Sequence, residues 1–380
     1  MLLYCMRRDW AHEFPHRAGL VHLNHAGVAP WPARTARAVT AFATENTRHS
    51  TEKVLQWKQK ESELRSACQR LIHAENASDI ALVKNTSEGL SMVAYGIPWK
   101  AQDNVVFARQ EFPSNRILWQ SLQPRFGVEA RCVDLHEAPT PEDALFGQVD
   151  RNTRLISVSA VQYDDGLRMD LARISEFCQA RGILFCIDAI QMLGAIPFDL
   201  TETPADFVIA DGHKWLLGPE GIGLFYCNPE KRDLLLLNQF GWHMLENPGD
   251  FESQHWALAK DATRFECGTL NHAGIHALHE SLHMLLEIGI KDIHDMISSN
   301  ISYLHEISVE NRLDIVSRMD PGRRSGILTV RRPGTDNQAL FRSLLRSGVL
   351  CAHRCQGIRF SPHFYTSRED LDHALRLVCE

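Results

Sequence analysis

The sequence predicts an α/β fold with a mostly parallel sheet, followed by a smaller α+β unit at the C-terminal end. Short apolar runs alternate with stretches of helical periodicity, and this alternation requires right-handed crossovers between parallel strands. Two of the runs, 182–187 and 206–210, are followed by polar residues, which is typical of the ligand-binding edge of such a sheet. After a long helix at Gly274–Ile290, helices and short strands mix, which indicates the smaller unit.

The elements of the larger unit follow in chain order. Helical periodicity covers Ala33–Glu52 and Lys53–His73, and the strand Ile80–Val83 then leads into a helix opened by Thr86–Gly89. Further strands are expected at 104–107, 155–161, 182–187 and 206–210, with helices from residue 115 and over 171–181. The apolar run 221–226 follows the last of these strands too closely for a crossover, so we expect it to pair antiparallel.

The smaller unit combines three helices with three short strands. The helices are expected near 292–308, 337–347 and 367–378, and the strands near 315, 327–330 and 357–360. We place the large unit at residues 16–285 and the small one at 286–380, with residues 1–15 packing on the latter. Met6 is an alternative translation start within that first segment.

Composition limits the classes of function. The formal net charge of −7 gives no basic field for nucleic acid or a membrane surface, and no apolar stretch reaches membrane-spanning length. The 19 histidines and 10 cysteines show no metal-ligand or disulfide-framework spacing, so we expect no metal site. Free thiols, together with a start that lacks signal-peptide order, indicate the cytoplasm.

Two strand ends carry the chemistry. Asp188 ends one apolar run and Lys214 follows the next, so an acid and an amine should meet at one edge of the sheet. This pair suits pyridoxal phosphate (PLP), because a lysine amine forms a Schiff base with its aldehyde and a carboxylate keeps the pyridine nitrogen protonated. An ordinary surface lysine and a capping aspartate are the alternatives.

Three segments resemble one enzyme group: Leu23–Gly27, Asp211–Pro219 and Ile358–Tyr365. In this order over more than 300 residues, they are similar to the class V aminotransferase-like enzymes of fold type I. That group includes cysteine desulfurases, selenocysteine lyases, kynureninases and isopenicillin-N-epimerase-like proteins. The resemblance implies a large domain with a mostly parallel seven-stranded sheet, PLP as cofactor and an amino acid as substrate.

The resemblance also assigns roles to residues. Lys214 matches the Schiff-base lysine and general base, Asp188 the acid at the pyridinium, and Gln191 the contact of the cofactor phenolate. Thr86 and Ser87 match the phosphate clamp, at a place where a strand becomes a helix. His213 and Thr269 would complete it, and His213 is also a candidate catalytic residue. Because Thr269 lies in a segment that reaches the neighbouring subunit's cofactor in the family, the resemblance implies a homodimer with shared active sites.

Other matches are looser. Phe112 takes the place of the ring that stacks on the cofactor, where desulfurases have histidine, and either Gln162 or Tyr163 replaces a family asparagine near the phenolate. Asp211 stands where desulfurases have serine, and its charge would repel a phosphate, so we expect a supporting role such as a hydrogen bond to His213. For the substrate, the resemblance implies that Arg359 binds the α-carboxylate in a bidentate fork. The remaining matches are Asn24 and His25, in the N-terminal segment that covers the substrate in the family.

The reaction is left open by the sequence. Cys351 and Cys355 lie only eight and four residues before Arg359, too close for a flexible loop that carries a nucleophilic thiol. We therefore prefer aminotransferase-type chemistry on an external aldimine over cysteine desulfurase-like or other C–S lyase activity, with amino-acid epimerisation third. A PLP-binding protein without catalysis is a further alternative, which the intact Lys214, Asp188 and Arg359 disfavour.

Overall fold

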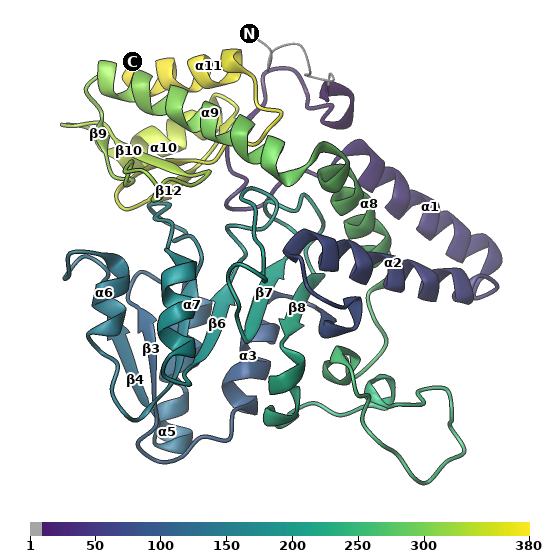
Figure 1. Cartoon of the computed structure of the whole chain (residues 1–380). Coiled ribbons are helices and arrows are strands. Elements are labelled where there is room, and N and C mark those ends of the chain that lie inside the picture. The colour runs from purple at the N-terminus through teal and green to yellow at the C-terminus, as the bar shows by residue number, and fades with distance from the viewer. Residues whose placement is uncertain (1–9) are drawn as a thin grey trace.

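The computed structural model describes residues 10–380, and it arranges them as a broad α/β layer with a smaller α+β layer above it (Figure 1). The predicted packing of residues 1–15, and the question about Met6, fall wholly or partly on residues 1–9, which lie outside the described residues. Within the described part, the ring of Phe14 stacks on Tyr365 with centroids 3.5 Å apart. The domain division at residue 285 stays a prediction.

A seven-stranded sheet forms the centre of the large layer, in the order β2-β8-β7-β6-β5-β3-β4. Only β8 runs opposite to the other six strands, so the predicted mostly parallel sheet and its one antiparallel strand are both confirmed. The strands are β2 (Ile80–Val83), β3 (Asn104–Ala108), β4 (Glu129–Val133), β5 (Thr153–Ser159), β6 (Leu184–Asp188), β7 (Phe207–Asp211) and β8 (Gly223–Cys227).

The edge strand β4 was not predicted from its own residues. Its sequence is Glu-Ala-Arg-Cys-Val, and the exposed Glu129 pairs with Arg131 at 2.7 Å. Charged side chains at a sheet edge discourage pairing with other chains, but they also remove the apolar signal that identifies a strand. Sequence periodicity therefore found six strands, and the family resemblance supplied the number seven.

Helices cover both faces of the sheet. Alternate residues of each strand feed two separate cores: Ile80 and Leu82 belong to one, Ala81 and Val83 to the other. The helices of the larger layer are α1 (Ala33–His49), α2 (Val54–Ile72), α3 (Thr86–Gly96), α4 (Pro113–Gln120), α5 (Leu122–Phe126), α6 (Pro141–Phe146), α7 (Leu171–Gln179) and α8 (His272–Ile288). Short 3-10 helices lie at Ala11–Glu13, Ala77–Asp79, Pro229–Leu234, Trp242–Met244 and Ala262–Phe265.

The C-terminal layer begins where the long predicted helix breaks. Gly289 has φ +93°, a conformation that favours glycine, and separates α8 from α9 (Ile290–Glu310). A four-stranded antiparallel sheet follows, in the order β12-β13-β10-β9. Its strands are β9 (Asp314–Ile315), β10 (Leu328–Arg331), β12 (Ala352–Arg354) and β13 (Gly357–Phe360), with helices α10 (Asn337–Arg346) and α11 (Arg368–Cys379).

Two short strands of this layer, β12 and β11 (Val349–Leu350), were not predicted, because two or three residues carry no periodicity. The strand β11 pairs in parallel with β1 (Val21–His22) near the start of the chain. This pairing holds the segment before α1 against the C-terminal layer.

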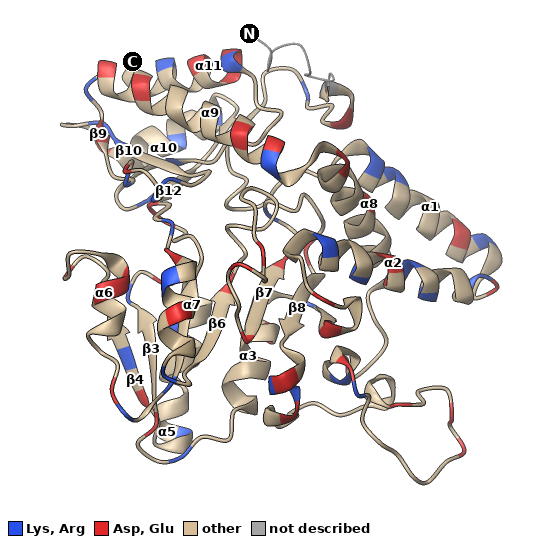
Figure 2. Cartoon of the chain, in the orientation of Figure 1, with Lys and Arg blue, Asp and Glu red and all other residues tan. Residues whose placement is uncertain are grey.

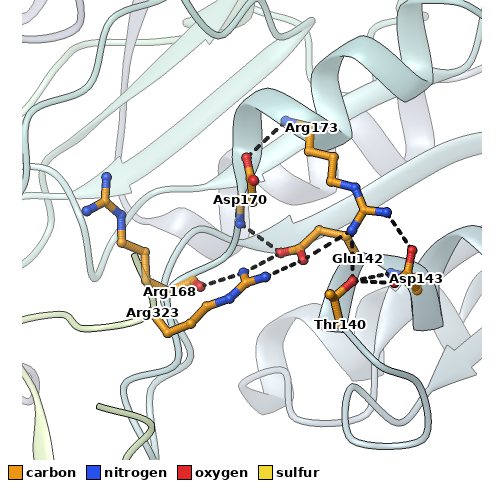
Figure 3. Close-up of polar contacts among 7 residues, drawn as sticks. All are labelled: Thr140, Glu142, Asp143, Arg168, Asp170, Arg173 and Arg323. Carbon is orange, nitrogen blue, oxygen red and sulfur yellow. Dashed lines mark hydrogen bonds and ion pairs between the residues drawn. The ribbon is translucent and has the colours of Figure 1, made fainter. Parts of the chain in front are cut away.

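A buried ion pair also joins the two layers (Figure 3). The carboxylate of the fully buried Glu142 on α6 accepts hydrogen bonds from both terminal nitrogens of Arg323, each at 2.7 Å. The backbone N–H of Asp170 donates to the same carboxylate at 2.8 Å. Arg323 comes from the loop between β9 and β10. The loop after β5 is held as well, because the hydroxyls of Ser325 and Thr329 donate to its backbone carbonyls.

Surface character differs between regions. Charged residues are spread over the outer helices, while the ribbons of β6 to β8 are largely uncharged (Figure 2). The segment between β8 and α8 projects from the body as an extended arm (Figure 1) and exposes five large apolar side chains, Leu236, Phe240, Trp242, Phe251 and Trp256. Among residues 10–380, no helix combines the length and apolarity needed to cross a membrane.

Candidate active site

The carboxyl ends of three neighbouring strands create the site. β5, β6 and β7 are parallel neighbours, with Ser159 opposite Asp188 and Asp188 opposite Ile209. Asp211 ends β7, and Lys214 follows in the turn after it. The predicted meeting of an acid and an amine at one sheet edge therefore holds, because each contributes to the pKa of the other.

Lys214 is held as a partly buried amine. Burial lowers its pKa to about 8, although the nearby charge of Asp188 acts in the opposite direction. The ammonium lies 5.6 Å from the centre of the Phe112 ring, so an aromatic face covers one side of it. Near pH 8 a large fraction of this lysine is an unprotonated nucleophile, whereas an exposed lysine is almost fully charged.

Asp188 is buried and oriented by two donors. The side-chain amide of Asn115 donates to its Oδ2 at 2.7 Å, and the backbone N–H of Ile190 donates to Oδ1 at 3.1 Å. Burial raises the pKa of Asp188 despite these bonds. Sequence reasoning missed Asn115, which stands in the first turn of α4 beside the predicted Phe112; its place after a strand end was the available signal.

The start of α3 leaves a hydroxyl free. Asn85, not Thr86, caps the helix by accepting from Glu88 N at 2.9 Å. Thr86 Oγ1 is buried and has no partner among the described residues. A buried donor beside the positive end of a helix is a ready contact for an anion. The neighbouring Ser87 is exposed and bonds to Ser114 Oγ at 2.9 Å.

Asp211 lies beside this helix start and does not orient His213 by a hydrogen bond as expected. Its Oδ2 accepts from Thr86 N at 3.3 Å, whereas His213 Nδ1 is 3.6 Å away, beyond hydrogen-bond range. Burial raises the pKa of Asp211 to about 7 and lowers that of His213 to about 4. The two side chains are therefore a half-neutral acid and a neutral imidazole near pH 7.

Thr269 makes no hydrogen bond to the other residues predicted for the phosphate clamp. Its side chain is exposed on the surface segment before α8, and no hydrogen bond joins it to Thr86 or to His213. The assignment of Thr269 to a phosphate clamp therefore stays a prediction.

Phe112 contacts the residues that follow β5. The Tyr163 ring meets Phe112 edge-on at 5.2 Å, and Gln162 turns inward, where its Nε2 donates to Glu111 at 3.2 Å. Gln162 Oε1 is buried without a partner among residues 10–380. Glu111, which sequence reasoning missed, also accepts from Ser159 N, and burial raises its pKa to about 7.

Gln191 is buried between two parts of the fold. Its amide nitrogen donates to Ala26 O at 3.0 Å, and its Oε1 accepts from Trp215 Nε1 at 2.8 Å. One N–H of the amide stays available for a ligand, because a side-chain amide carries two. The predicted phenolate contact can therefore use only that hydrogen.

Arg359 reaches the site from β13. Its terminal nitrogens donate to Tyr163 O and to Asn24 Oδ1, the latter at 3.1 Å, and its Nε is buried without a partner among the described residues. No carboxylate of residues 10–380 lies within ion-pair distance, although the guanidinium is almost completely buried. Burial lowers the pKa of Arg359 to about 10, which still leaves it charged at neutral pH.

His25 serves the fold in this structure. It is fully buried, Nδ1 faces Ser361 O at 2.8 Å, and Nε2 faces Tyr365 Oη at 2.7 Å. Burial lowers its pKa far below the usual range, so the ring is neutral. With both nitrogens occupied, His25 has no free ring nitrogen for the predicted substrate contact.

Neither cysteine near Arg359 is an activated thiol. Cys351 is buried, and burial raises its pKa to about 12. The pKa of Cys355 is also raised to about 12, by burial and by Asp164, whose Oδ2 lies 3.3 Å from the sulfur. Nucleophilic cysteines require the opposite shift.

The residues present fit PLP. Asp188 lies near Lys214. Thr86 and Gln162, which follow strands of the same sheet, each have a buried side-chain oxygen without a hydrogen-bond partner among the described residues. Thr86 lies at a helix start suited to a phosphate, and Phe112 offers a ring face. The arrangement defines a lysine–carboxylate site for an anionic aromatic cofactor.

Comparison with known proteins agrees with this class. The family model "Aminotransferase class-V" matches residues 21–374. A probable cysteine desulfurase of Methanothermobacter thermautotrophicus is 30% identical over 97% of this chain and 96% of its own. The isopenicillin N epimerase of Streptomyces clavuligerus is 26% identical over 93% of this chain and 92% of its own. A mutant of C-DES, solved with glycine covalently linked to the PLP cofactor, superposes with a TM-score of 0.89 at 20% identity, over 97% of this chain and 98% of its own.

The chain belongs to the class V aminotransferase family. The family is PLP-dependent, and this protein is accordingly a PLP-dependent enzyme. Its relatives carry the names of different reactions, so family membership leaves the reaction of this chain unassigned.

Proposed function

We propose that the protein is a PLP-dependent aminotransferase that acts at the Cα of an amino acid. The observation that carries the proposal is the placement of Lys214, whose depressed pKa supplies a free amine near the buried acid Asp188 and near Arg359, which makes no ion pair with a described residue. The cofactor, when bound, withdraws electrons from the Cα bonds of the substrate. Residues of the chain would bind the cofactor and the substrate and would transfer the proton.

The cofactor would be held at both ends. Asp188, fixed by Asn115, would pair with the ring nitrogen, and Phe112 would stack on the ring face. Thr86 and Ser87, with the N-terminal amides of α3, would bind the phosphate, and Gln191 and Gln162 would contact the phenolate side. Arg359 would bind the substrate α-carboxylate, with Asn24 beside it.

Proton transfer favours transamination. Lys214 Nζ would accept a proton from the substrate Cα, and transamination would require the same nitrogen to deliver that proton to the cofactor and not back to Cα. Phe112 carries no titratable group, whereas a histidine at that place would offer a second proton. Because a single nitrogen takes and delivers the proton in transamination, this arrangement supports that reaction over epimerisation, which needs a donor on the opposite face.

C–S bond cleavage is the second candidate. Its support is the similarity to a probable cysteine desulfurase and to structures that include the cystine C–S lyase C-DES. The protonated, engaged thiols of Cys351 and Cys355 argue against a persulfide-forming cysteine. A lyase reaction that does not use a protein thiol is separated from transamination by product analysis.

We further propose a cytoplasmic homodimer with shared sites. Five large apolar side chains on the arm between β8 and α8 are exposed in one chain, and such a patch marks an interaction surface. The exposed Thr269 lies on the segment that follows this arm. Burial of the arm against a second copy would also bring Thr269 toward that copy's phosphate clamp.

The test uses the purified protein with PLP and Lys214→Ala. Borohydride reduction should fix the cofactor on the peptide that contains residue 214 in the native protein and leave the variant unlabelled, as peptide masses will show. Incubation with single amino acids should then yield keto acids, and sulfide or racemised amino acid should stay absent. Label on another lysine would refute the assignment, and sulfide release from cysteine or cystine would replace transamination by C–S lysis.

A further inference from the structure

A second arginine shares the substrate-facing side of the small sheet with Arg359. In the antiparallel pair β12–β13, Ala352 lies directly opposite Arg359, so both side chains project from one face. Arg354 follows Ala352 by two residues and therefore projects from that same face. Diagonal neighbours of this kind are roughly 7–8 Å apart, within joint reach of one small ligand.

A tight turn fixes Arg354. The two residues that connect β12 to β13, Cys355 and Gln356, have φ values of +47° and +57°. Two consecutive positive φ angles form the two-residue hairpin whose twist matches the flanking strands. Gly357, opposite Arg354 across the turn, has no side chain to compete for the space over the sheet.

Arg354 has no anionic partner. Its Nη1 donates to His353 O at 2.7 Å, its Cζ lies 5.8 Å from the centre of the Tyr163 ring, and its Nε is buried and unpartnered. Within residues 10–380 no carboxylate reaches it at ion-pair distance. The nearby Asp164 is occupied, because its two oxygens accept from Asp165 N and from the Cys355 thiol.

The position of Arg354 relative to the reactive amine follows from a row of contacts. The Tyr163 ring, over which Arg354 lies, packs edge-on against Phe112, and Phe112 faces Lys214. The positive charge of Arg354 contributes to the depressed pKa values of both Lys214 and Arg359. Two guanidinium groups therefore lie near the reactive amine, and a single α-carboxylate needs only one of them.

We propose that the substrate is an amino acid with an anionic side chain, its α-carboxylate bound by Arg359 and its second acidic group by Arg354. The inference rests on the proposed function, since it names the substrate class of that site. A charge-assisted hydrogen bond from a partly buried arginine favours an anion over its neutral isostere, because an unmatched charge loses its water without compensation.

Binding and turnover test the proposal separately. Calorimetry on the PLP-loaded protein compares succinate with succinamate, which differ by one charge and cannot react. We expect roughly tenfold to hundredfold tighter binding of succinate, a preference that Arg354→Gln abolishes while succinamate affinity is unchanged. Arg116→Gln is the matched control, because this exposed arginine also lies near Tyr163 but away from the sheet face. It should keep the preference.

Turnover of aspartate against asparagine gives the second comparison, with kcat/KM expected to favour aspartate by a similar factor in the native protein only. Equal binding of succinate and succinamate, or an equal loss of both ligands in Arg354→Gln, would overturn the proposal. If Arg116→Gln had the same effect as Arg354→Gln, the succinate preference would come from general electrostatic attraction and not from a contact with Arg354, and the proposal would be overturned. If succinate preference held while no amino acid reacted, the proposed function would fail and the paired-arginine site would stand.

Discussion

Replacing Asp211 by asparagine should stabilise the cofactor-free protein above neutral pH. Burial raises the pKa of this carboxyl from its usual 3.8 to about 7, so the folded chain keeps a proton that the unfolded chain releases. Stability of the native protein therefore falls as pH rises through this window, by about 1.4 kcal/mol per pH unit for one group. Above pH 7 the full cost of the buried charge is present.

The magnitude follows from that window. Between pH 5 and pH 7 the carboxyl alone removes about 2.3 kcal/mol of stability, which asparagine does not lose, because the full slope applies only between the unfolded and folded pKa values. The variant keeps an acceptor for Thr86 N, whose bond to Asp211 is 3.3 Å. It also withdraws a negative charge from Lys214, which reduces the gain, so we expect about 2 kcal/mol between these two pH values.

Thermal melting of both apoproteins from pH 5 to pH 8.5 measures the difference, which should widen until about pH 7 and then level off. PLP affinity gives an independent check, because an ionised Asp211 repels the phosphate. The affinity of the native protein should weaken through the same window more steeply than that of Asp211→Asn. A stability difference that is constant with pH, or a variant less stable than the native protein at pH 8.5, would refute this reasoning.

Two other predictions concern the ion pair that joins the two layers and the arm between β8 and α8. Glu142→Gln removes the charge from the buried partner of Arg323 and should cost about 3 kcal/mol at pH 7, measured by urea unfolding. The native advantage should shrink only as pH falls below 4.5, because the bonds from Arg323 outweigh burial and lower the pKa of Glu142 in the folded protein. Serine at both Phe251 and Trp256, 77% and 63% exposed, should shift the mass seen by light scattering from dimer to monomer. Serine at Val309, exposed on α9, is the control; a monomeric native protein would contradict the proposed interface.

The strands that build the site were predictable because they are buried on both faces. Each of β6, β7 and β8 is apolar along its whole length, and a polar residue marks the end of the first two. Lys214 and Asp188 were found for this reason, and adjacent strands then had to bring them together. The edge strand β4 and the two-residue β11 lack such a run, so only pairing with a neighbour defines them.

Partners of the site residues were not predictable. Asn115 and Glu111 lie in the turn that opens α4, and nothing local shows that one holds Asp188 while the other holds Ser159. The same limit explains why Asp211 was expected to orient His213, when the amide it contacts belongs to α3, more than a hundred residues earlier.

By itself, the sequence determined which residues carry reactive groups, in which order they occur, and which face of each element is apolar, because these depend on composition and local periodicity. Tertiary structure alone decided which groups share a site, which hydrogen bonds occupy them and how far burial shifts their pKa values. Desolvation and electrostatic coupling act through space, so they depend on neighbours that the order of the chain does not reveal. The two arginines of one hairpin face, side by side and without a counter-ion, belong to that second class.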